Sequence, residues 1–288
     1  MTPAVEVKNL THYYLKGTEN QVAAVNNINL CVEKGETLGI IGHTGSGKST
    51  LIAHFNGLLK PDKGEVIVDG VNIFENKQTL RQSRFKVGLC FQYPEYQLFE
   101  ETVYKDIAFG PSNMKLPREE IERRVLTAAE MAGVKKENLE KSPFDLSGGE
   151  KRRAAIAGVM SMEPQVLVLD EPAAGLDPAG RRDLINMIKN YRTATGCTVI
   201  IVSHSMKDIA SVADRVCVLN KAEIAMLGTP KEVYSRDEEL RAMGLNVPEI
   251  TKIFLMLKNR GFNVPEDVFT VDEAVAAFRE FAKGGVKK

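Results

Sequence analysis

The sequence predicts an α/β fold built on a parallel β-sheet. Residues 37–41, 166–169 and 198–202 form short runs that are almost continuously apolar, as is typical of strands buried on both faces of a parallel sheet. Each run leads into polar residues and then into a helical pattern, the alternation of strand and helix that characterises an α/β core. We expect residues 1–228 to form one domain around this sheet.

Shorter strands are predicted around the first of these runs. Residues 5–7 and 28–32 alternate between apolar and polar side chains, and residues 65–68 lead into Asp69-Gly70, a pair typical of hairpin turns. We expect these early strands to be short and antiparallel.

Two later segments have helical character. Between residues 117 and 145, Pro117 and several glutamates open a run with apolar residues at helical spacing, which Gly133 ends. We expect a helical subdomain over about residues 93–162. Capping-box patterns at residues 229–232 and 270–273 open further helices with apolar faces. We predict that residues 229–288 form a helical appendix, whose apolar faces pack on a core of their own or on a partner.

The composition excludes several classes of protein. The 288 residues include 38 Lys and Arg and 38 Asp and Glu, a net charge of zero, which argues against nucleic-acid binding through bulk basicity. Hydrophobic residues make up 43% of the chain, too many for a disordered protein. No apolar run approaches the ~18 residues that cross a bilayer, and the N-terminus does not resemble a signal peptide. We expect a chain that is neither secreted nor membrane-spanning.

The cysteines and histidines do not indicate a metal site. Cys31, Cys90, Cys197 and Cys217 are far apart, no pair has the spacing of metal ligands, and three of them lie in apolar, strand-like runs. We interpret them as reduced thiols that are mostly buried. The four histidines are equally scattered, so the sequence does not predict a zinc site.

A glycine-rich loop follows the first buried strand and precedes a helix predicted over residues 50–59. Glycines let the backbone N–H groups of such a loop converge on phosphate oxygens, and the helix N-terminus adds positive potential. We expect Lys48 to reach the β- and γ-phosphates of a nucleotide and Ser49 to bind Mg²⁺. The alternative is a glycine-rich turn without a ligand. The residues predicted to bind ATP here are Gly42, His43, Thr44, Gly45, Ser46, Gly47, Lys48, Ser49 and Thr50.

The second buried strand ends in two carboxylates, Asp170 and Glu171. At the carboxyl end of this strand, Asp170 can hold Mg²⁺ beside Ser49. Glu171 can act as the general base that activates water. Alone, the two acids would also fit a solvated loop; together with the phosphate-binding loop, they favour hydrolysis of a nucleotide.

A second anion site is predicted at the start of another helix. Ser147, Gly148, Gly149 and Glu150 precede the helical residues 151–162, and Ser147 with Glu150 forms a good capping box. Two adjacent glycines in a first turn cost about 1 kcal/mol each relative to alanine, but they leave bare N–H groups at a positive helix end. Because one chain cannot plausibly fold both anion sites onto one nucleotide, we expect this site to serve the ATP of a second subunit.

These motifs resemble the ATP-binding subunits of ABC transporters. Residues 146–150 are similar to the family's signature motif, and Gln92, after a strand expected at residues 87–91, is similar to its glutamine loop. Asp177 is similar to the residue of the loop that crosses the dimer interface, and His204 to the histidine that contacts the γ-phosphate. Tyr14 matches the aromatic residue that stacks on adenine, with Tyr13 as the alternative.

The resemblance implies roles for these residues. It implies that Gln92 senses the γ-phosphate and Mg²⁺ and faces a membrane partner, and that catalysis uses Glu171, His204, Lys48 and Gln92. Taken singly, Gln92 also fits a surface position, Tyr14 a core position, Asp177 a helix cap and His204 a strand end. Two positions depart from the usual pattern: Glu150 stands where many members have Gln, and Ala173 stands where Thr or Ser is common.

A narrower resemblance is to the ATPases of energy-coupling factor (ECF) transporters, most closely to the second A-type subunit. It rests on residues 42–48, 91–99 and 150–153 and on the helical appendix. It implies an ATPase that powers uptake of vitamins or transition-metal ions from the cytoplasmic face of the membrane. The implied partners are a second ATPase, paired through the appendix, an integral membrane coupling protein contacted near residues 92–99, and membrane-embedded substrate-binding proteins.

Two other functions stay open. One is the ATPase of a dedicated homodimeric cobalt or nickel importer. The other is an ABC ATPase outside transport, although such proteins usually carry two cassettes or a long coiled coil. We expect Tyr93, Pro94, Tyr96, Leu98 and Phe99 to supply apolar surface to the membrane partner; the alternative is packing between the two lobes.

Overall fold

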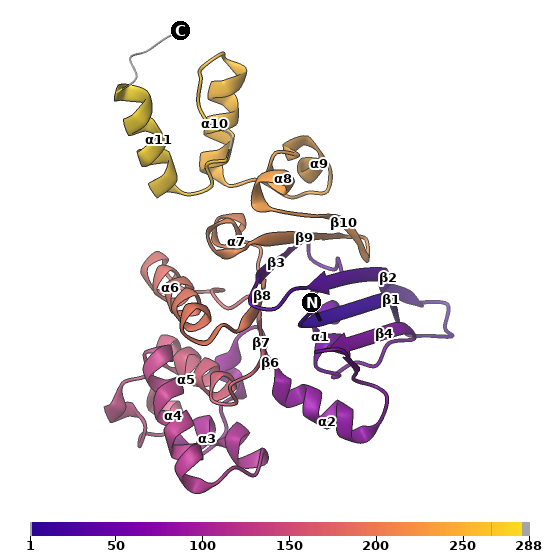
Figure 1. The fold of residues 1–288 in the computed structure, drawn as a ribbon, viewed down its shortest axis with the longest axis vertical. Coiled ribbons are helices and arrows are strands. Elements are labelled where there is room, and N and C mark those ends of the chain that lie inside the picture. The colour runs from indigo at the N-terminus through magenta and orange to yellow at the C-terminus, as the bar shows by residue number, and fades with distance from the viewer. Residues whose placement is uncertain (1, 266, 284–288) are drawn as a thin grey trace.

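A six-stranded sheet lies at the centre of the computed structural model, which describes residues 2–265 and 267–283 (Figure 1). The strand order is β10-β9-β3-β8-β7-β6, and β9, β3, β8, β7 and β6 pair in parallel while β10 is antiparallel to β9. The predicted parallel core is confirmed. The strands are β3 (Thr37–Ile41), β6 (Val87–Cys90), β7 (Val166–Asp170), β8 (Thr198–Val202), β9 (Arg215–Asn220) and β10 (Glu223–Gly228).

A second, antiparallel sheet has the order β2-β1-β4-β5. Its strands are β1 (Val5–Tyr14), β2 (Val22–Val32), β4 (Lys63–Val68) and β5 (Val71–Asn72). The predicted hairpin at Asp69-Gly70 joins β4 to β5. The strands β1 and β2 are longer than predicted, because register shifts, with positive φ at Asn9 and Asn27, interrupt the alternation that marks a strand in the sequence.

Helices flank the central sheet. They are α1 (Lys48–Phe55), α2 (Lys77–Lys86), α6 (Pro178–Thr195) and α7 (Met206–Val212). The prediction that the first helix reaches residue 59 is wrong. Gly57 adopts a φ of 71°, and the amides of Leu58 and Leu59 turn back to the carbonyl of Ala53, so the helix ends at Phe55.

Three helices gather at one end of the sheet, at the lower left of Figure 1. They are α3 (Val103–Asn113), α4 (Arg118–Ala132) and α5 (Gly148–Met160), with three short 3₁₀ turns, η1 (Pro94–Gln97), η2 (Lys136–Asn138) and η3 (Pro143–Asp145). The helix α4 ends at Gly133 with a φ of 71°, as predicted. The helix α5 begins earlier than the predicted residue 151, because the capping box of Ser147 and Glu150 already starts it at Gly148.

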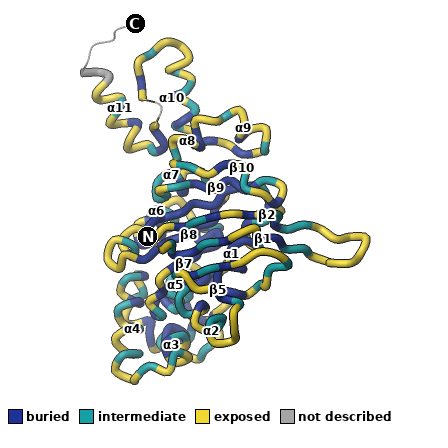
Figure 2. Tube along the Cα trace, turned by 45° about the vertical axis from the view of Figure 1, so that its right-hand side comes forward, coloured by how far each residue is buried: buried dark blue, intermediate teal, exposed yellow. Residues whose placement is uncertain are grey.

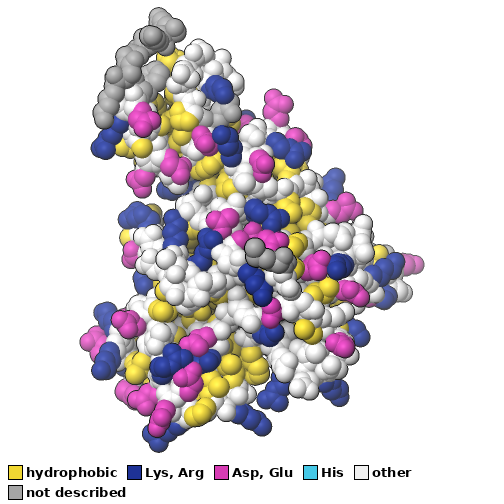
Figure 3. Space-filling view, viewed as in Figure 1, with side chains coloured by type: hydrophobic (Ala, Val, Ile, Leu, Met, Phe, Trp, Pro, Cys, Tyr) yellow, Lys and Arg dark blue, Asp and Glu magenta, His cyan; other side chains and the backbone are white. Residues whose placement is uncertain are grey.

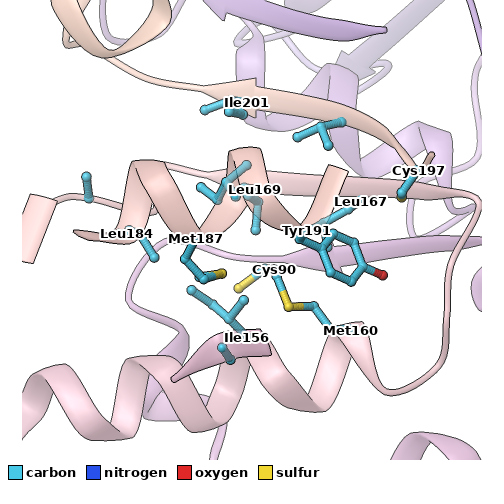
Figure 4. Close-up of a cluster of buried hydrophobic side chains, with 14 of the residues drawn as sticks. Cys90, Ile156, Met160, Leu167, Leu169, Leu184, Met187, Tyr191, Cys197 and Ile201 are labelled. Atoms are coloured by element: carbon cyan, nitrogen blue, oxygen red, sulfur yellow. The ribbon is translucent and has the colours of Figure 1, made fainter. Parts of the chain in front are cut away.

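Both faces of the central sheet are buried along β3, β6, β7 and β8, whereas the edge strand β10 is largely exposed (Figure 2). One face packs against α5 and α6, and Figure 4 shows this cluster, which includes Cys90, Ile156, Met160, Leu167, Leu169, Leu184, Met187, Tyr191, Cys197 and Ile201. The other face packs against α1 and the antiparallel sheet through residues such as Leu10, Ile28, Leu38, Ile40, Phe55 and Ile200. All four cysteines are free thiols; Cys31 is partly exposed and the other three are buried.

The C-terminal segment contains α8 (Pro230–Tyr234), α9 (Asp237–Ala242), α10 (Glu249–Asn259) and α11 (Val271–Lys283). The capping boxes at Thr229 and Thr270 are confirmed. The first two helices join the large cluster through Val233, Tyr234 and Leu240. The last two form a separate small core with Phe254, Val264, Val268 and Ala274. The domain boundary at residue 228 stays a prediction, and residues 266 and 284–288 of the predicted appendix lie outside the described part.

The surface carries both signs of charge. On the face drawn in Figure 3, Lys and Arg alternate with Asp and Glu without a large patch of one sign, in keeping with the zero net charge. No helix within residues 2–265 and 267–283 is both long enough and apolar enough to cross a membrane.

The separate C-terminal core generates a stability prediction. Phe254 is fully buried there, and we expect Phe254→Ala to cost about 3–5 kcal/mol. Because its neighbours belong to a separate cluster, amide hydrogen exchange should accelerate in α10 and α11 and stay unchanged in β7 and β8. Ile253→Ala, at a half-exposed neighbouring position, is the matched control and should change little. Faster exchange throughout the chain would contradict a separate core.

Candidate functional site

The loop between β3 and α1 forms the floor of the site, and two of its glycines are required by close approach. A Cβ atom on Gly42 would lie 2.4 Å from the carbonyl oxygen of Leu219. Gly47 caps α1 with a φ of 103°, and a Cβ there would lie 2.2 Å from the carbonyl oxygen of Ala24. The loop can therefore lie against its neighbours only because these positions have no side chain.

A cleft of about 350 Å³ opens above this loop. It brings together predicted residues from five separate parts of the chain: Tyr14, Thr44, Gly45, Gly47, Lys48, Ser49, Thr50, Gln92, Asp170, Glu171 and His204. Gly42, His43 and Ser46 belong to the loop but do not line the cleft. Val22, Ala23 and Ala24 do line it and were not predicted, because small apolar residues at the start of a strand carry no signal for a ligand.

Lys48 is buried beneath the loop. Its ammonium group donates hydrogen bonds to the carbonyl oxygens of Gly42, at 2.8 Å, and of His43, at 3.0 Å. Burial lowers the pKa of Lys48, while the nearby Glu171 and Asp170 oppose this effect. A cation held in this way beside a helix N-terminus suits phosphate oxygens.

Asp170 lies at the end of β7 and is almost fully buried. Burial raises the pKa of its carboxyl group, while a hydrogen bond with the Ser49 side chain lowers it. A carboxylate and a hydroxyl side by side are oxygen donors of the kind that Mg²⁺ prefers. Across residues 2–265 and 267–283, no three His, Cys, Asp or Glu side chains cluster as metal ligands. A Mg²⁺ ion here would therefore take further ligands from phosphates and water.

Glu171 and His204 face each other across the cleft. The Nε2 atom of His204 lies 3.2 Å from Oε1 of Glu171. Glu171 adopts a φ of 47°, which is uncommon for a residue with a long side chain and is typical of functional sites. Burial raises the pKa of its carboxyl group, although the charge of His204 acts in the opposite direction. The result is a carboxylate suited to accepting a proton from water.

Tyr14 lies at the end of β1 and is about half exposed. Its hydroxyl is 3.3 Å from Oγ1 of Thr50, at the start of α1, and its side chain lines the cleft. Tyr13, the alternative partner for adenine, does not line the cleft, and its amide donates to the carboxylate of Asp62. The geometry favours Tyr14.

Comparison with known proteins agrees with this geometry. Residues 25–174 match the family described as ABC transporter. The chain belongs to this family. The energy-coupling factor transporter ATP-binding protein EcfA2 of Clostridium perfringens is 52% identical over 97% of this chain and 99% of its own length, and that of Caldanaerobacter subterraneus is 49% identical over 97% and 98%. The recognition as an ECF-type ABC ATPase is thereby confirmed.

Solved structures show the same fold. CbiO1 of Clostridium perfringens, described as part of the ABC transporter complex cbiONQ, has a TM-score of 0.75 and 38% identity, over 88% of this chain and 99% of its own. A dimeric ATP-binding cassette in a post-hydrolysis state, bound to ADP and Pi, has a TM-score of 0.71 and 29% identity over 78% and 98%. The predicted ABC ATPase fold is confirmed: the chain is an ABC ATPase that binds ATP.

The residues predicted to form the signature motif, and Asp177, do not line the cleft of their own chain. Ser147 caps α5, and its hydrogen bonds lower the pKa of Glu150 to about 2. A Cβ atom added at Gly148 or at Gly149 would have no neighbouring atom within 4 Å. Asp177 caps α6 by accepting a hydrogen bond from the amide of Gly180 at 2.7 Å. Ser147 and Asp177 therefore act as helix caps. The two glycines leave the start of α5 open to another molecule.

The segment after Gln92 divides into exposed and buried residues. Tyr93, Tyr96 and Phe99 are exposed, whereas Pro94 and Leu98 are buried. The prediction that all five are exposed apolar residues is wrong for Pro94 and Leu98, which are buried, although Leu98 still lines the groove beside this segment. Next to this segment lies a groove of about 320 Å³, whose lining includes Phe85, Gln97, Leu98, Phe99, Phe109 and Met162.

The raised pKa of Glu171 predicts a pH-dependent effect on stability. The folded protein binds this proton more tightly than the unfolded chain, so the ionised carboxylate reduces stability above its pKa. We expect Glu171→Gln to raise the melting temperature at neutral pH, with a gain that shrinks as the pH falls through the carboxyl range. Glu249→Gln, at a side chain that is 96% exposed, is the control. An equal gain at every pH would contradict this explanation.

Proposed function

We propose that the chain is the ATP-hydrolysing subunit of an ECF importer that powers uptake of vitamins or transition-metal ions. The observation that carries this proposal is the single cleft in which Lys48, Asp170, Glu171 and His204 meet Gln92. The names of relatives that match nearly the whole chain support the ECF subtype.

The polar residues of the cleft have separate roles in binding and hydrolysing ATP. Lys48 neutralises the β- and γ-phosphates, and Tyr14 stacks on adenine. Glu171 takes a proton from the attacking water, and His204, 3.2 Å from that carboxylate, orients the γ-phosphate together with Gln92. Ser49, Asp170 and Gln92 would hold Mg²⁺, which supplies positive charge to the phosphate oxygens when bound.

A second ATPase would complete the site. Ser147 and Asp177 are exposed and do not line the cleft of their own chain, so they suit the ATP of another subunit in a head-to-tail pair. The α10–α11 module supplies a further contact, because Ile253, Met256, Val271, Val275 and Phe278 are exposed apolar residues. The known dimeric cassettes support this arrangement.

A membrane protein is the second partner. The groove beside Phe99 and the exposed rings of Tyr93 and Tyr96 form an apolar surface next to Gln92, which fits a helix of an integral coupling protein. The chain would then lie at the cytoplasmic face of the membrane as a peripheral subunit. Separate membrane-embedded proteins would select the solute. The mixed surface charge does not favour nucleic acid as a partner.

One alternative has its own support. The similarity to CbiO1, a part of the cbiONQ complex, fits the ATPase of a dedicated homodimeric cobalt or nickel importer. An ABC ATPase outside transport is less favoured, because the relatives that match the whole chain have transporter names.

Substitution of the general base tests the catalytic assignment. Glu171→Gln removes the proton acceptor but leaves Lys48 and the loop in place, so turnover should fall by about 10²–10⁴-fold while ATP still binds. The measurements are phosphate release and binding of a fluorescent ATP analogue. Lys48→Ala is the contrasting variant and should lose ATP binding itself. Undiminished hydrolysis by Glu171→Gln would remove Glu171 from this role.

Purification of tagged protein from membranes in mild detergent tests the transport assignment. A second ATPase, one common membrane protein and several different small membrane proteins would establish a shared ECF module. A single dedicated membrane set without a second ATPase would favour the homodimeric importer. Recovery without any membrane protein would refute transport.

A further inference from the structure

Arg152, in the second turn of α5, is a buried charge that the proposed chemistry does not use. Only 4% of the residue is exposed. Its guanidinium group donates two hydrogen bonds to the carboxylate of Glu95, at 3.0 and 2.6 Å. It also donates to the carbonyl oxygens of Ala174, at 2.5 Å, and Pro172, at 3.3 Å. Such a planar group with several fixed donors is the side chain best suited to joining distant segments.

The partners of Arg152 belong to two segments far apart in the sequence. Glu95 lies in η1, three residues after Gln92, whereas Pro172 and Ala174 lie between Glu171 and Asp177. The two segments also approach each other through Tyr93. The Cζ atom of Arg152 lies 5.9 Å from the centroid of the Tyr93 ring, and a Cβ atom on Gly175 would lie 3.9 Å from Cε1 of that ring. Arg152 therefore lies at the point where α5 and these two segments meet.

The energetics favour a rigid junction. Burial alone would raise the pKa of Glu95, but the hydrogen bonds and charge of Arg152 outweigh it, so the pKa lies below its usual value. Removing one partner of a buried ion pair strongly destabilises the folded protein, because the other charge stays buried without a compensating charge. The segments cannot separate from α5 without exposing or orphaning these groups.

The junction is also connected to the catalytic residues. The amide of Ala174 donates to the carbonyl oxygen of Glu171, at 3.1 Å, and α5 begins at the cap residue Ser147. A displacement of η1 would therefore reach both the general base and the start of α5. Arg153, the next residue, has different partners: it donates to the carbonyl oxygen of Ala132 and lies 3.8 Å from Asp183.

We propose that Arg152 is a positioning residue that fixes η1, the loop of residues 172–177 and α5 as one unit, so that a partner acting on the segment after Gln92 moves Ser147 and Asp177 with it. The link to a membrane partner rests on the proposed function. The mechanical coupling of η1 to residues 172–177 does not, and the two parts can be tested separately.

Amide hydrogen exchange of the isolated chain tests the coupling. Glu95→Gln alters η1 only, and none of the described hydrogen bonds or ion pairs of Glu95 involves residues 172–177. We expect this variant to speed exchange in residues 172–177 severalfold. In an Arg152→Gln background, the same change should have no further effect there. Confinement of the effect to η1, or additive effects in the double variant, would overturn the proposal, whatever the function of the chain.

ATP turnover with the membrane partners tests the consequence. We expect Arg152→Gln to lower kcat by about tenfold or more, with KM and ATP affinity within about twofold of wild type because Arg152 does not line the cleft that binds ATP. Arg152→Lys, which keeps the charge but not the planar donors, should restore only part of kcat, and Arg153→Gln should behave as wild type. An unchanged kcat, or equal losses in the two glutamine variants, would overturn the proposal. If Arg152→Gln does not fold, Glu95→Gln replaces it, and we expect the same lower kcat with KM and ATP affinity near those of wild type.

Discussion

Burial of the parallel sheet on both faces is the constraint on which the site depends. Every residue of β3, β7 and β8 is buried, so polar side chains within these strands would be costly. Polar groups appear where the strands end: the phosphate-binding loop after β3, Asp170 and Glu171 at β7, and His204 after β8. Because these strands are parallel and adjacent, their carboxyl ends meet at one edge and form one cleft.

Features with a local signal could be predicted from the sequence. The buried strands read as apolar runs, and the loop around Lys48 has a pattern that depends on backbone geometry rather than on distant contacts. The capping boxes at Ser147 and Thr229 were predictable for the same reason, since both partners lie within one turn of helix. Lys48, Ser49, Asp170 and Glu171 were predictable because they follow recognisable buried strands. Gln92, His204 and Tyr14 were assigned only through the resemblance to a known family.

Features that depend on tertiary packing could not be predicted. Register shifts near Asn9 interrupt the alternation of apolar and polar residues along β1, so most of this strand has no strand pattern in the sequence. The burial of Pro94 and Leu98 depends on packing against distant elements. Arg152 and Glu95 are 57 residues apart, and a pair at that separation has no pattern in the sequence. The same applies to Ala24, whose carbonyl limits the space at Gly47.

The separate core around Phe254 has a consequence for evolution. A module with its own core depends little on packing against the rest of the chain, and none of the described side chains of α10 and α11 lines the ATP cleft. If this module contacts the second ATPase, as proposed, gene duplication can produce ATPases whose module surfaces, and therefore pairing partners, diverge while the sequence of the catalytic site is conserved. Pairing preference and chemistry are free to change at different rates in the same gene.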